Sequence, residues 1–335
     1  MKVLIIGAGA IGGSLACYLS TAKDLEITIL EKNQEVVSAI KEHGIFLRDV
    51  DKTYQKKVNV VSELGDEIYD CCFSATRAYH MKSAVSGVLK NISPDGFVVS
   101  MNNGVCIEPL LEVVGEDRAL WCSINFGAGI EDKGKYFIKI HGGVVMGGRG
   151  KISDKLREFK DRLACDLDIT LTDNVVGALY SKMLINSCIT STAIVSGLTL
   201  GDILSRKSGK KVFLNIIREG VEVAKRAGIT IPNYGSLNYY TFTSKSPIGF
   251  IYRAVVFPYL RKKYGKRTSA TLEAMKKGVK SEIDYFNGYV VRLGESCGVL
   301  AKVNKAVVDC VKEVEEDMSK ISADRLSALA CVGKN

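Results

Sequence analysis

The sequence predicts an α/β fold: a doubly wound, mostly parallel sheet in the first half of the chain, followed by an all-α second domain. Two observations lead to this prediction. Up to Asp173, short apolar runs alternate with helical stretches, as is typical of βαβ units. Beyond Asp173, apolar residues recur at helical spacing with few β-branched runs.

The elements expected in the first half follow that alternation. An apolar strand at 1–6 and a helix at 11–19 precede a strand at 26–30, a helix at 34–42 and two short strands between Gly44 and Val61. Buried strands are expected at 69–75 and 97–101, with a helix at 77–89 between them. Strands at 119–126, 136–141 and 143–147 and a helix at 154–163 complete the half, and 133–150 is expected to extend one sheet edge in antiparallel fashion.

The second half is expected to consist of helices at 174–191, 210–227, 270–297 and 303–319. Asp173 is a plausible N-cap, while Gly228 and Gly298 are plausible helix stops. We therefore expect domains at 1–172 and 173–325, with 326–335 as a tail. No low-complexity linker separates the domains, so we expect them to pack tightly, with a ligand cleft outside the carboxyl ends of the strands.

Composition excludes several classes of protein. A chain of 335 residues suggests two domains, and it contains no uninterrupted apolar segment long enough to span a membrane. The apolar N-terminus continues into a βαβ pattern, which argues against a signal peptide. Ten scattered cysteines without C-x-x-C and three distant histidines predict no metal site, and they favour reduced thiols in a cytoplasmic protein. The net charge of +9 suits an anionic cofactor and substrate, or a basic surface.

The segment 236–267 is basic and aromatic, and no acid occurs between Ser236 and Leu272. Such a segment can contact nucleic acid or a membrane surface, or its cations can frame an acidic substrate. We favour a loop–helix excursion whose aromatic side chains pack on the domain beneath, because no RNA- or DNA-binding motif accompanies the charge. No nucleic-acid or membrane partner is expected, and a homodimer is left open.

The N-terminus carries a glycine-rich fingerprint. Gly7, Gly9 and Gly12 follow the first strand, and Glu31 ends the second. In a Rossmann-type fold these glycines allow a sharp turn, close approach of a pyrophosphate and close helix packing. The helix start, with Ala10 and Ile11, presents N–H groups to the anion. We therefore expect a dinucleotide site.

Three further features could carry chemistry. Asn103 follows a buried strand, although Asn-Gly is also a common turn. Lys182 and Asn186 lie four residues apart on one face of an apolar helix, where the lysine could be a proton donor or could simply reach solvent. Glu282 falls in another expected helix and could equally be a surface acid.

Four stretches of the sequence resemble the ketopantoate reductase (2-dehydropantoate 2-reductase) family over nearly the full chain: GAGAIGG, NNGVCIEPL, SKMLIN and SEIDYFNGYVVRLGESCGV. The resemblance implies reduction of the C2 ketone of a small 2-oxo acid by NAD(P)H, with ketopantoate giving pantoate in pantothenate biosynthesis. It implies that Lys182 is the general acid, that Asn103 and Asn186 bind substrate, and that Glu282 contacts the substrate hydroxyl or holds Lys182. Asn103 is also expected to contact the cofactor.

The chain departs from the family pattern at three places. Thr190 stands where a second asparagine is usual, Leu200-Gly201-Asp202 replaces Asn-Gly-Glu, and Ala270 replaces a carboxylate-binding serine. A register shift of one residue would give that last role to Ser269. The substrate therefore stays open to another 2-oxo acid or an opine-type imine. A protein of another class, a non-catalytic dinucleotide sensor that binds nucleic acid or a partner, is the remaining alternative.

The cofactor is also open between NADH and NADPH. Glu31 favours NADH, because a carboxylate accepts hydrogen bonds from ribose hydroxyls and repels a 2′-phosphate. The family usually prefers NADPH, and Lys32 and Arg77 are cations that could lie near the adenosine end.

Overall fold

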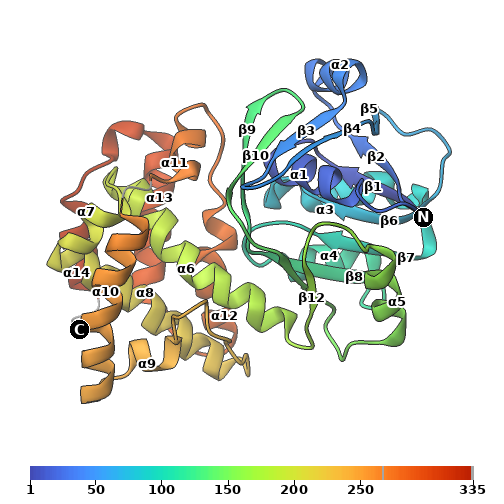
Figure 1. Ribbon diagram of the computed structural model, residues 1–335. Helices are drawn as coiled ribbons and strands as arrows, with labels where there is room; N and C mark the ends of the chain where they lie inside the picture. Colours follow the sequence, from blue (N-terminus) through green and yellow to red (C-terminus); the bar gives the residue numbers. More distant parts are fainter. Residues whose placement is uncertain (266–267, 333–335) are drawn as a thin grey trace. The chain divides into compact units, whose positions relative to one another are not determined.

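The computed structural model describes residues 1–265 and 268–332. The chain divides into two compact units, Met1–Val175 and a second that begins at Val176 (Figure 1). No helix within the described residues is both long enough and apolar enough to cross a membrane.

The first unit is built on an eight-stranded sheet with the order β12-β11-β8-β7-β6-β1-β2-β5. Its strands are β1 (Lys2–Ile6), β2 (Glu26–Leu30), β5 (Asn59–Val61), β6 (Tyr69–Ser74), β7 (Ile92–Ser100), β8 (Ala119–Ile124), β11 (Val144–Gly147) and β12 (Ile169–Leu171). All neighbours are parallel except β8 and β11. Its helices are α1 (Ala10–Leu19), α2 (Gln34–His43), α3 (Ala78–Val88), α4 (Ile107–Val114) and α5 (Asp154–Arg162). Because the chain builds outward from β1 in both directions, the predicted doubly wound α/β fold is confirmed.

A second sheet in this unit corrects two predictions. It has the order β4-β3-β10-β9, with β3 (Ile45–Arg48), β4 (Thr53–Lys56), β9 (Gly127–Asp132) and β10 (Lys135–Ile140). The stretch from Gly44 to Val61 therefore holds three strands, not two, of which only β5 joins the main sheet. The expected edge extension at 133–150 is correct for β11 and wrong for β10, because β10 pairs with β3 and β9 instead.

The second unit is helical, as the sequence predicts. Its helices are α6 (Val175–Ser196), which starts at the last residue of the first unit, α7 (Leu200–Ser205), α8 (Lys207–Arg226), α9 (Tyr239–Thr243), α10 (Pro247–Tyr264), α11 (Ala270–Met275), α12 (Asn287–Ser296), α13 (Lys302–Glu316) and α14 (Arg325–Cys331). The stretch expected to be a tail from 326 onward instead begins within α14, which packs on α8 and buries Leu326 and Leu329. Residues 333–335 lie outside the described ranges.

The helix expected at 270–297 is wrong as a continuous element. Gly278 has a φ of +81°, a left-handed conformation that suits glycine and ends the turn that follows α11. A short 3₁₀ helix at Ile283–Tyr285 then precedes α12. Asp173 is likewise not the residue before α6, because α6 begins at Val175; its carboxylate accepts a hydrogen bond from the Ile152 N–H at 2.5 Å.

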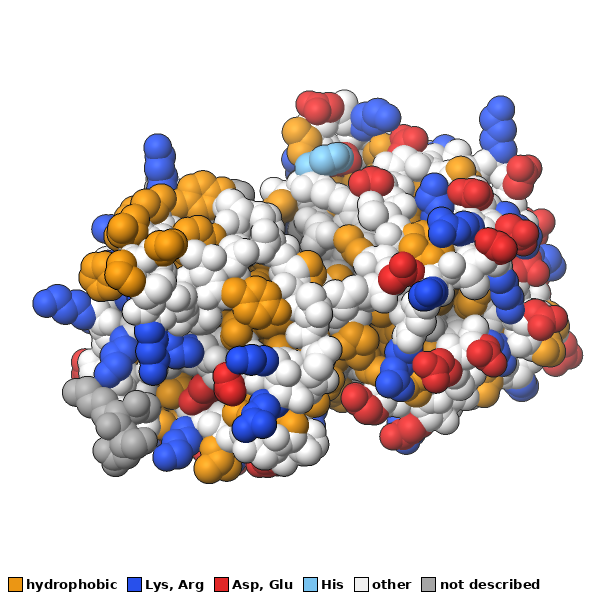
Figure 2. Space-filling model, turned by 90° about the horizontal axis from the view of Figure 1, so that it is seen from below, with side chains coloured by type: hydrophobic (Ala, Val, Ile, Leu, Met, Phe, Trp, Pro, Cys, Tyr) orange, Lys and Arg blue, Asp and Glu red, His pale blue; other side chains and the backbone are white. Residues whose placement is uncertain are grey.

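The basic aromatic segment forms α9 and α10, and its aromatic residues divide between two environments. Tyr239, Phe242 and Phe257 are buried, as expected for an excursion that packs on its own unit. The outer face of α10 is apolar, with Ile248, Phe250, Ile251 and Val255 between 64% and 72% exposed. Figure 2 shows hydrophobic side chains gathered on the helical unit at the left of the view, beside lysine and arginine side chains. Lys266 and Arg267 lie outside the described residues.

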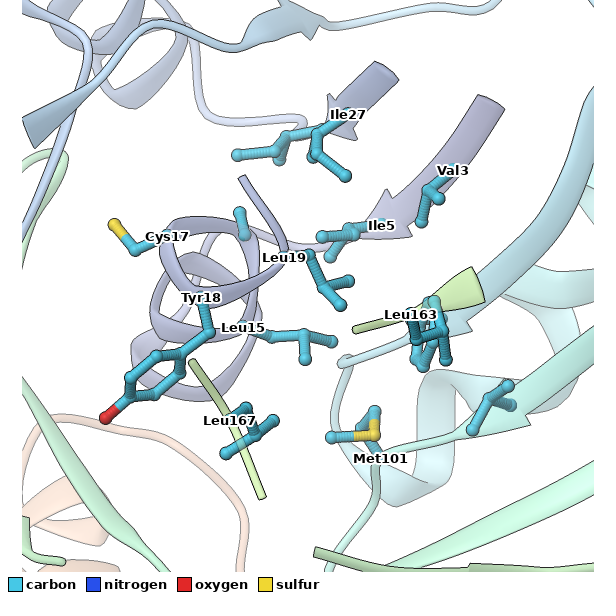
Figure 3. Packing of buried hydrophobic residues seen from close by; sticks show 14 of the residues in the cluster. Val3, Ile5, Leu15, Cys17, Tyr18, Leu19, Ile27, Met101, Leu163 and Leu167 are labelled. Carbon is cyan, nitrogen blue, oxygen red and sulfur yellow. The ribbon is translucent and has the colours of Figure 1, made fainter. Parts of the chain in front are cut away.

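The core of the first unit forms between α1 and the main sheet. Leu15 and Leu19 of α1 are almost fully buried and point toward Ile5 of β1, while Tyr18 points to the other side of the helix (Figure 3). Leu163 and Leu167 complete this cluster from the end of the unit. Burial of the apolar side of α1 is what stabilises the βαβ turn.

Two glycines allow α1 to approach its neighbours closely. A Cβ atom at Gly12 would lie 1.9 Å from the Gly7 carbonyl oxygen, and one at Gly13 would lie 1.9 Å from the ring of Tyr136. Tyr136, on β10, is fully buried and donates its hydroxyl proton to the Ala8 carbonyl at 2.9 Å. These contacts hold the start of α1 between the two sheets. A Cβ at Gly9, in contrast, would meet nothing within 4 Å.

We expect Gly12→Ala and Gly13→Ala each to lower the free energy of unfolding by about 1–3 kcal/mol, because a methyl group must displace rigid backbone or a packed ring. Gly9→Ala is the matched control and should change stability by less than about 0.5 kcal/mol. Urea denaturation followed by circular dichroism measures all three. Equal stability of the three variants would show that α1 can move away from β1 without cost.

Candidate functional site

The glycine-rich turn after β1 leaves space for a ligand. Gly7 has a φ of +96°, which places the chain in the left-handed region, and its Cβ position lies 3.4 Å from the Ala75 carbonyl oxygen. Gly9 caps the N-terminus of α1 in an extended conformation, with open space where a side chain would be. Ala10 and Ile11 form the first turn of α1. The free N–H groups of this turn suit an anion such as a pyrophosphate.

Glu31 lies directly beside this turn. Its Oε2 accepts a hydrogen bond from the Ala8 N–H at 2.7 Å, and its Oε1 accepts one from the Asn33 N–H at 2.9 Å. The carboxylate is therefore fixed in place, and each oxygen keeps a lone pair for a further donor. Lys32, the next residue, is exposed.

Asn102 and Asn103 follow β7 at the same edge of the sheet. Asn102 is buried; its Nδ2 donates to the Thr76 carbonyl at 2.6 Å, and its Oδ1 accepts from Ser100 Oγ at 2.9 Å. These bonds join the turns that follow β6 and β7. The half-buried side chain of Asn103 makes no hydrogen bond to any residue that the structure describes, so its amide is available to a ligand.

The sequence analysis selected Asn103 but not Asn102, whose hydrogen bonds join the two turns. The adjacent Asn-Asn pair was the sequence feature that could have indicated it. Arg77, at the N-cap of α3, is exposed. Because β1, β2, β6 and β7 are parallel neighbours, the structure brings Gly7, Glu31, Arg77 and Asn103 to one edge of the first unit's sheet.

In the second unit, α6 carries Lys182 and Asn186. The two residues are four apart and share one face of the helix. Burial lowers the pKa of the Lys182 ammonium from 10.5 to about 8. The half-buried Asn186 side chain has no hydrogen-bond partner within residues 1–265 and 268–332. This face of α6 thus offers a partly desolvated cation and a free amide.

The turn of α6 around Lys182 is firmly held. The Tyr180 hydroxyl donates to the Gly220 carbonyl of α8 at 2.8 Å, and Ser181 Oγ donates to the Pro232 carbonyl at 2.9 Å. A Cβ at Gly220 would lie 2.3 Å from Leu184, so α8 approaches α6 closely here. A rigid helix of this kind is suited to positioning a catalytic side chain.

Glu282 lies in a buried turn and not inside a helix, which corrects the sequence expectation. It is 7% exposed and directly precedes the 3₁₀ helix. The neighbouring Ser281 N–H donates to Glu315 Oε1 at 2.7 Å, a bond that a continuous helix would not permit. Buried carboxylates are rare and usually functional or paired, so Glu282 is not the surface acid considered as its alternative.

Two of the regions that depart from the family pattern contain helix caps. Ser269 is buried and caps α11, with its Oγ accepting from the Leu272 N–H at 3.2 Å; Ala270 is the first residue of that helix. The Asp202 N–H donates to Thr199 Oγ1 at 3.2 Å, which caps α7. Thr190 is half-buried on α6. Ser269 keeps its hydroxyl proton available for donation to a substrate carboxylate.

Among the described residues, no group of three or more histidine, cysteine or acidic side chains is placed to hold a metal ion. The first unit offers an anion cradle with a fixed carboxylate, and the second offers a lysine with a lowered pKa.

Two family models match the chain and between them cover most of it. Residues 3–150 match the model described as ketopantoate reductase PanE/ApbA, and residues 174–315 match the model described as ketopantoate reductase PanE/ApbA C terminal. The 2-dehydropantoate 2-reductase of Pyrococcus abyssi is 23% identical over 324 residues, which cover 94% of this chain and 98% of the relative. That of Aquifex aeolicus is 24% identical over 322 residues, with 94% and 97% covered.

Solved structures share the fold. A PanE/ApbA family ketopantoate reductase from Ralstonia eutropha aligns with a TM-score of 0.78 at 21% identity, covering 95% of this chain and all of the other. The ternary structure of D-mandelate dehydrogenase with NADH and anilino(oxo)acetate gives 0.78 at 20% identity with the same coverage. The α/β architecture, the matched models and the curated relatives agree, and the chain belongs to the ketopantoate reductase family of NAD(P)-dependent oxidoreductases.

Proposed function

We propose that the protein reduces the C2 ketone of a small 2-oxo acid with NAD(P)H, and that ketopantoate is its substrate. The observation that carries this proposal is Lys182, a half-buried lysine on the anchored helix of the second unit, whose pKa is lowered to about 8 by its surroundings. A lysine with a pKa lowered toward neutrality on a rigid helix is suited to donating a proton.

The glycine turn fits the pyrophosphate of a dinucleotide, because the Gly9 Cβ position is open and Gly7 adopts the positive φ that the turn requires. Gly7, Gly9, Ala10, Ile11 and the Asn103 amide would hold the cofactor. When bound, the reduced nicotinamide supplies the hydride.

Lys182 acts on the ketone oxygen. Because its pKa of about 8 lies above neutral pH, Lys182 is mostly protonated at pH 7. The ammonium donates a hydrogen bond to the oxygen as negative charge develops there, and then delivers its proton to form the hydroxyl. Asn186, one turn along α6, holds the substrate by its amide.

Glu282 and Ser269 have supporting roles in this proposal. Glu282, buried at the end of its turn, holds Lys182 or contacts the substrate hydroxyl, and Ser269 donates its hydroxyl proton to the substrate carboxylate. The alternative substrates are another 2-oxo acid or an opine-type imine. D-mandelate dehydrogenase shares this fold, and Thr190 and Ala270 change two positions that the family uses for substrate, so an aryl 2-oxo acid is the first alternative to test.

The proposal is tested by following absorbance at 340 nm with ketopantoate, phenylglyoxylate and pyruvate, each with NADH and NADPH. We expect kcat/KM above about 10⁴ M⁻¹s⁻¹ for ketopantoate. Turnover of phenylglyoxylate alone would establish the alternative substrate. Tight cofactor binding without turnover of any 2-oxo acid or imine would support the non-catalytic sensor instead.

We expect Lys182→Ala to lower kcat by about 10²–10⁴-fold, because the substitution removes the ammonium that supplies the proton and stabilises the alkoxide. Cofactor affinity, measured by fluorescence titration of NAD(P)H, should stay unchanged. Lys225→Ala, at an exposed lysine of α8, is the matched control and should keep full activity. Comparable turnover by the Lys182 variant would exclude it as the acid.

The rate of reduction should depend on pH through Lys182. Because the protonated form is the active one and its pKa is lowered to about 8, kcat/KM for reduction should be constant below that pH and fall tenfold per unit above it. Oxidation of the hydroxy acid needs the neutral amine and should rise through the same pH. A reduction rate that stays flat to pH 10 would contradict this assignment.

For the cofactor we propose NADH, because the fixed Glu31 carboxylate can accept from ribose hydroxyls and would repel a 2′-phosphate. Glu31→Gln keeps an oxygen for the Ala8 N–H and removes the charge. It should raise the ratio of kcat/KM for NADPH over NADH about tenfold, which corresponds to about 1.4 kcal/mol. Glu35→Gln, at an exposed acid of α2, is the control. An unchanged ratio in the Glu31 variant would mean that its carboxylate does not face the ribose.

A further inference from the structure

A chain of buried and half-buried hydrogen bonds joins three helices of the second unit. The Glu219 carboxylate of α8 accepts from the Val303 N–H at 2.8 Å, the Asn304 N–H at 2.9 Å and Asn304 Nδ2 at 2.8 Å. Asn304 Oδ1 then accepts from Asn287 Nδ2 of α12 at 3.0 Å. Both asparagines are fully buried, and the carboxylate lies at the N-terminus of α13, where its charge is favoured.

The same hydrogen-bond chain extends to the turn of α6 that carries Lys182 and to the turn that carries Glu282. Gly220, next to Glu219, accepts the hydrogen bond from Tyr180, two residues before Lys182. The rings of Tyr180 and Tyr289 of α12 meet edge to face, with centroids 6.3 Å apart. Asn287 is the first residue of α12 and follows the turn that carries Glu282. All of these residues lie in the second unit, whose helices α6, α8, α12 and α13 are labelled in Figure 1.

We propose that Asn287, Asn304, Glu219 and Tyr180 are positioning residues, whose hydrogen-bond chain fixes the turn that carries Glu282 relative to the turn of α6 that carries Lys182. This inference rests on the proposed function, since it assigns these residues to the alignment of that acid. None of the four is proposed to touch substrate or cofactor.

The residue types in this hydrogen-bond chain favour a positioning role over a role in packing alone. Asn287 Oδ1 is buried and has no hydrogen-bond partner in the described part of the chain. An unpaired buried acceptor destabilises a protein, and an apolar side chain would fill the same space at less cost. A polar residue at this position is explained by the direction of its Nδ2–H bond, which fixes one geometry between α12 and α13.

The first unit contains a matched control. Asn91 is also buried; its Nδ2 donates to two backbone carbonyls, of Gly65 at 2.8 Å and Glu67 at 2.9 Å, and its Oδ1 is likewise unpaired. It lies at the amino end of β7, at the sheet edge opposite to Asn103. Replacing it tests the stability cost of losing such an asparagine without disturbing the second unit.

The experiment compares Asn287→Ala, Asn91→Ala and the unchanged protein at a temperature well below the lowest Tm. Both variants should lose a similar amount of thermal stability. Only Asn287→Ala should lower kcat, by at least tenfold, with the KM for NAD(P)H unchanged, because the turn that carries Glu282 loses its fixed position. Equal kcat in the two variants would overturn the proposal.

Tyr180→Phe removes one hydroxyl and keeps the ring, so it tests the same linkage if Asn287→Ala does not fold. We expect a fall in kcat of at least threefold, with the KM for NAD(P)H unchanged. Lys182→Ala distinguishes a failure of the positioning role from a failure of the proposed function. If it abolishes turnover while Asn287→Ala and Tyr180→Phe keep full activity, the positioning role is wrong and the proposed function stands. If Lys182→Ala keeps full activity, the proposed function is wrong.

Discussion

The close approach of α1 to the end of β1 is the constraint on which the first unit depends. Gly12 lies over the Gly7 carbonyl, and Gly13 lies against Tyr136, which reaches across from the second sheet. Since no side chain fits at either contact, the helix is fixed with its N-terminal N–H groups beside the open space at Gly9. One set of steric contacts therefore joins the two sheets and shapes the anion cradle.

In the proposed function, the same turn ties cofactor preference to backbone geometry. Glu31 is held by the N–H groups of Ala8 and Asn33, so the carboxylate that we propose discriminates between ribose and phosphate also stabilises the glycine turn. Replacing Glu31 with a cationic residue would remove both hydrogen bonds and loosen the loop. The proposed selectivity thus depends on how firmly the strand end is fixed, as well as on charge.

The second unit places ionisable side chains, whose burial lowers stability, on rigid elements. Burial lowers the pKa of Lys182, and Glu282 is buried in its turn, so both side chains need surroundings that hold them in one geometry. Tyr180, Ser181 and Gly220 supply that support for α6 through contacts with α8 and the Pro232 loop. Family membership and fold define the class of reaction. We propose that the residues around α6 and α11, where Thr190 and Ala270 depart from the family pattern, determine the substrate.

The sequence by itself determined the α/β class, the order of the βαβ elements, the helical second half and the glycine fingerprint, because each is a local pattern of apolar period or turn residue. It also placed Lys182 and Asn186 on one face. Only tertiary structure decided the second sheet, since its β3–β10 pairing joins segments far apart in the chain. Helical periodicity continues across Gly278, so the break that puts Glu282 in a buried turn was hidden from the sequence. The Asn287–Asn304–Glu219 chain was hidden for the same reason: hydrogen bonds between distant helices leave no local pattern.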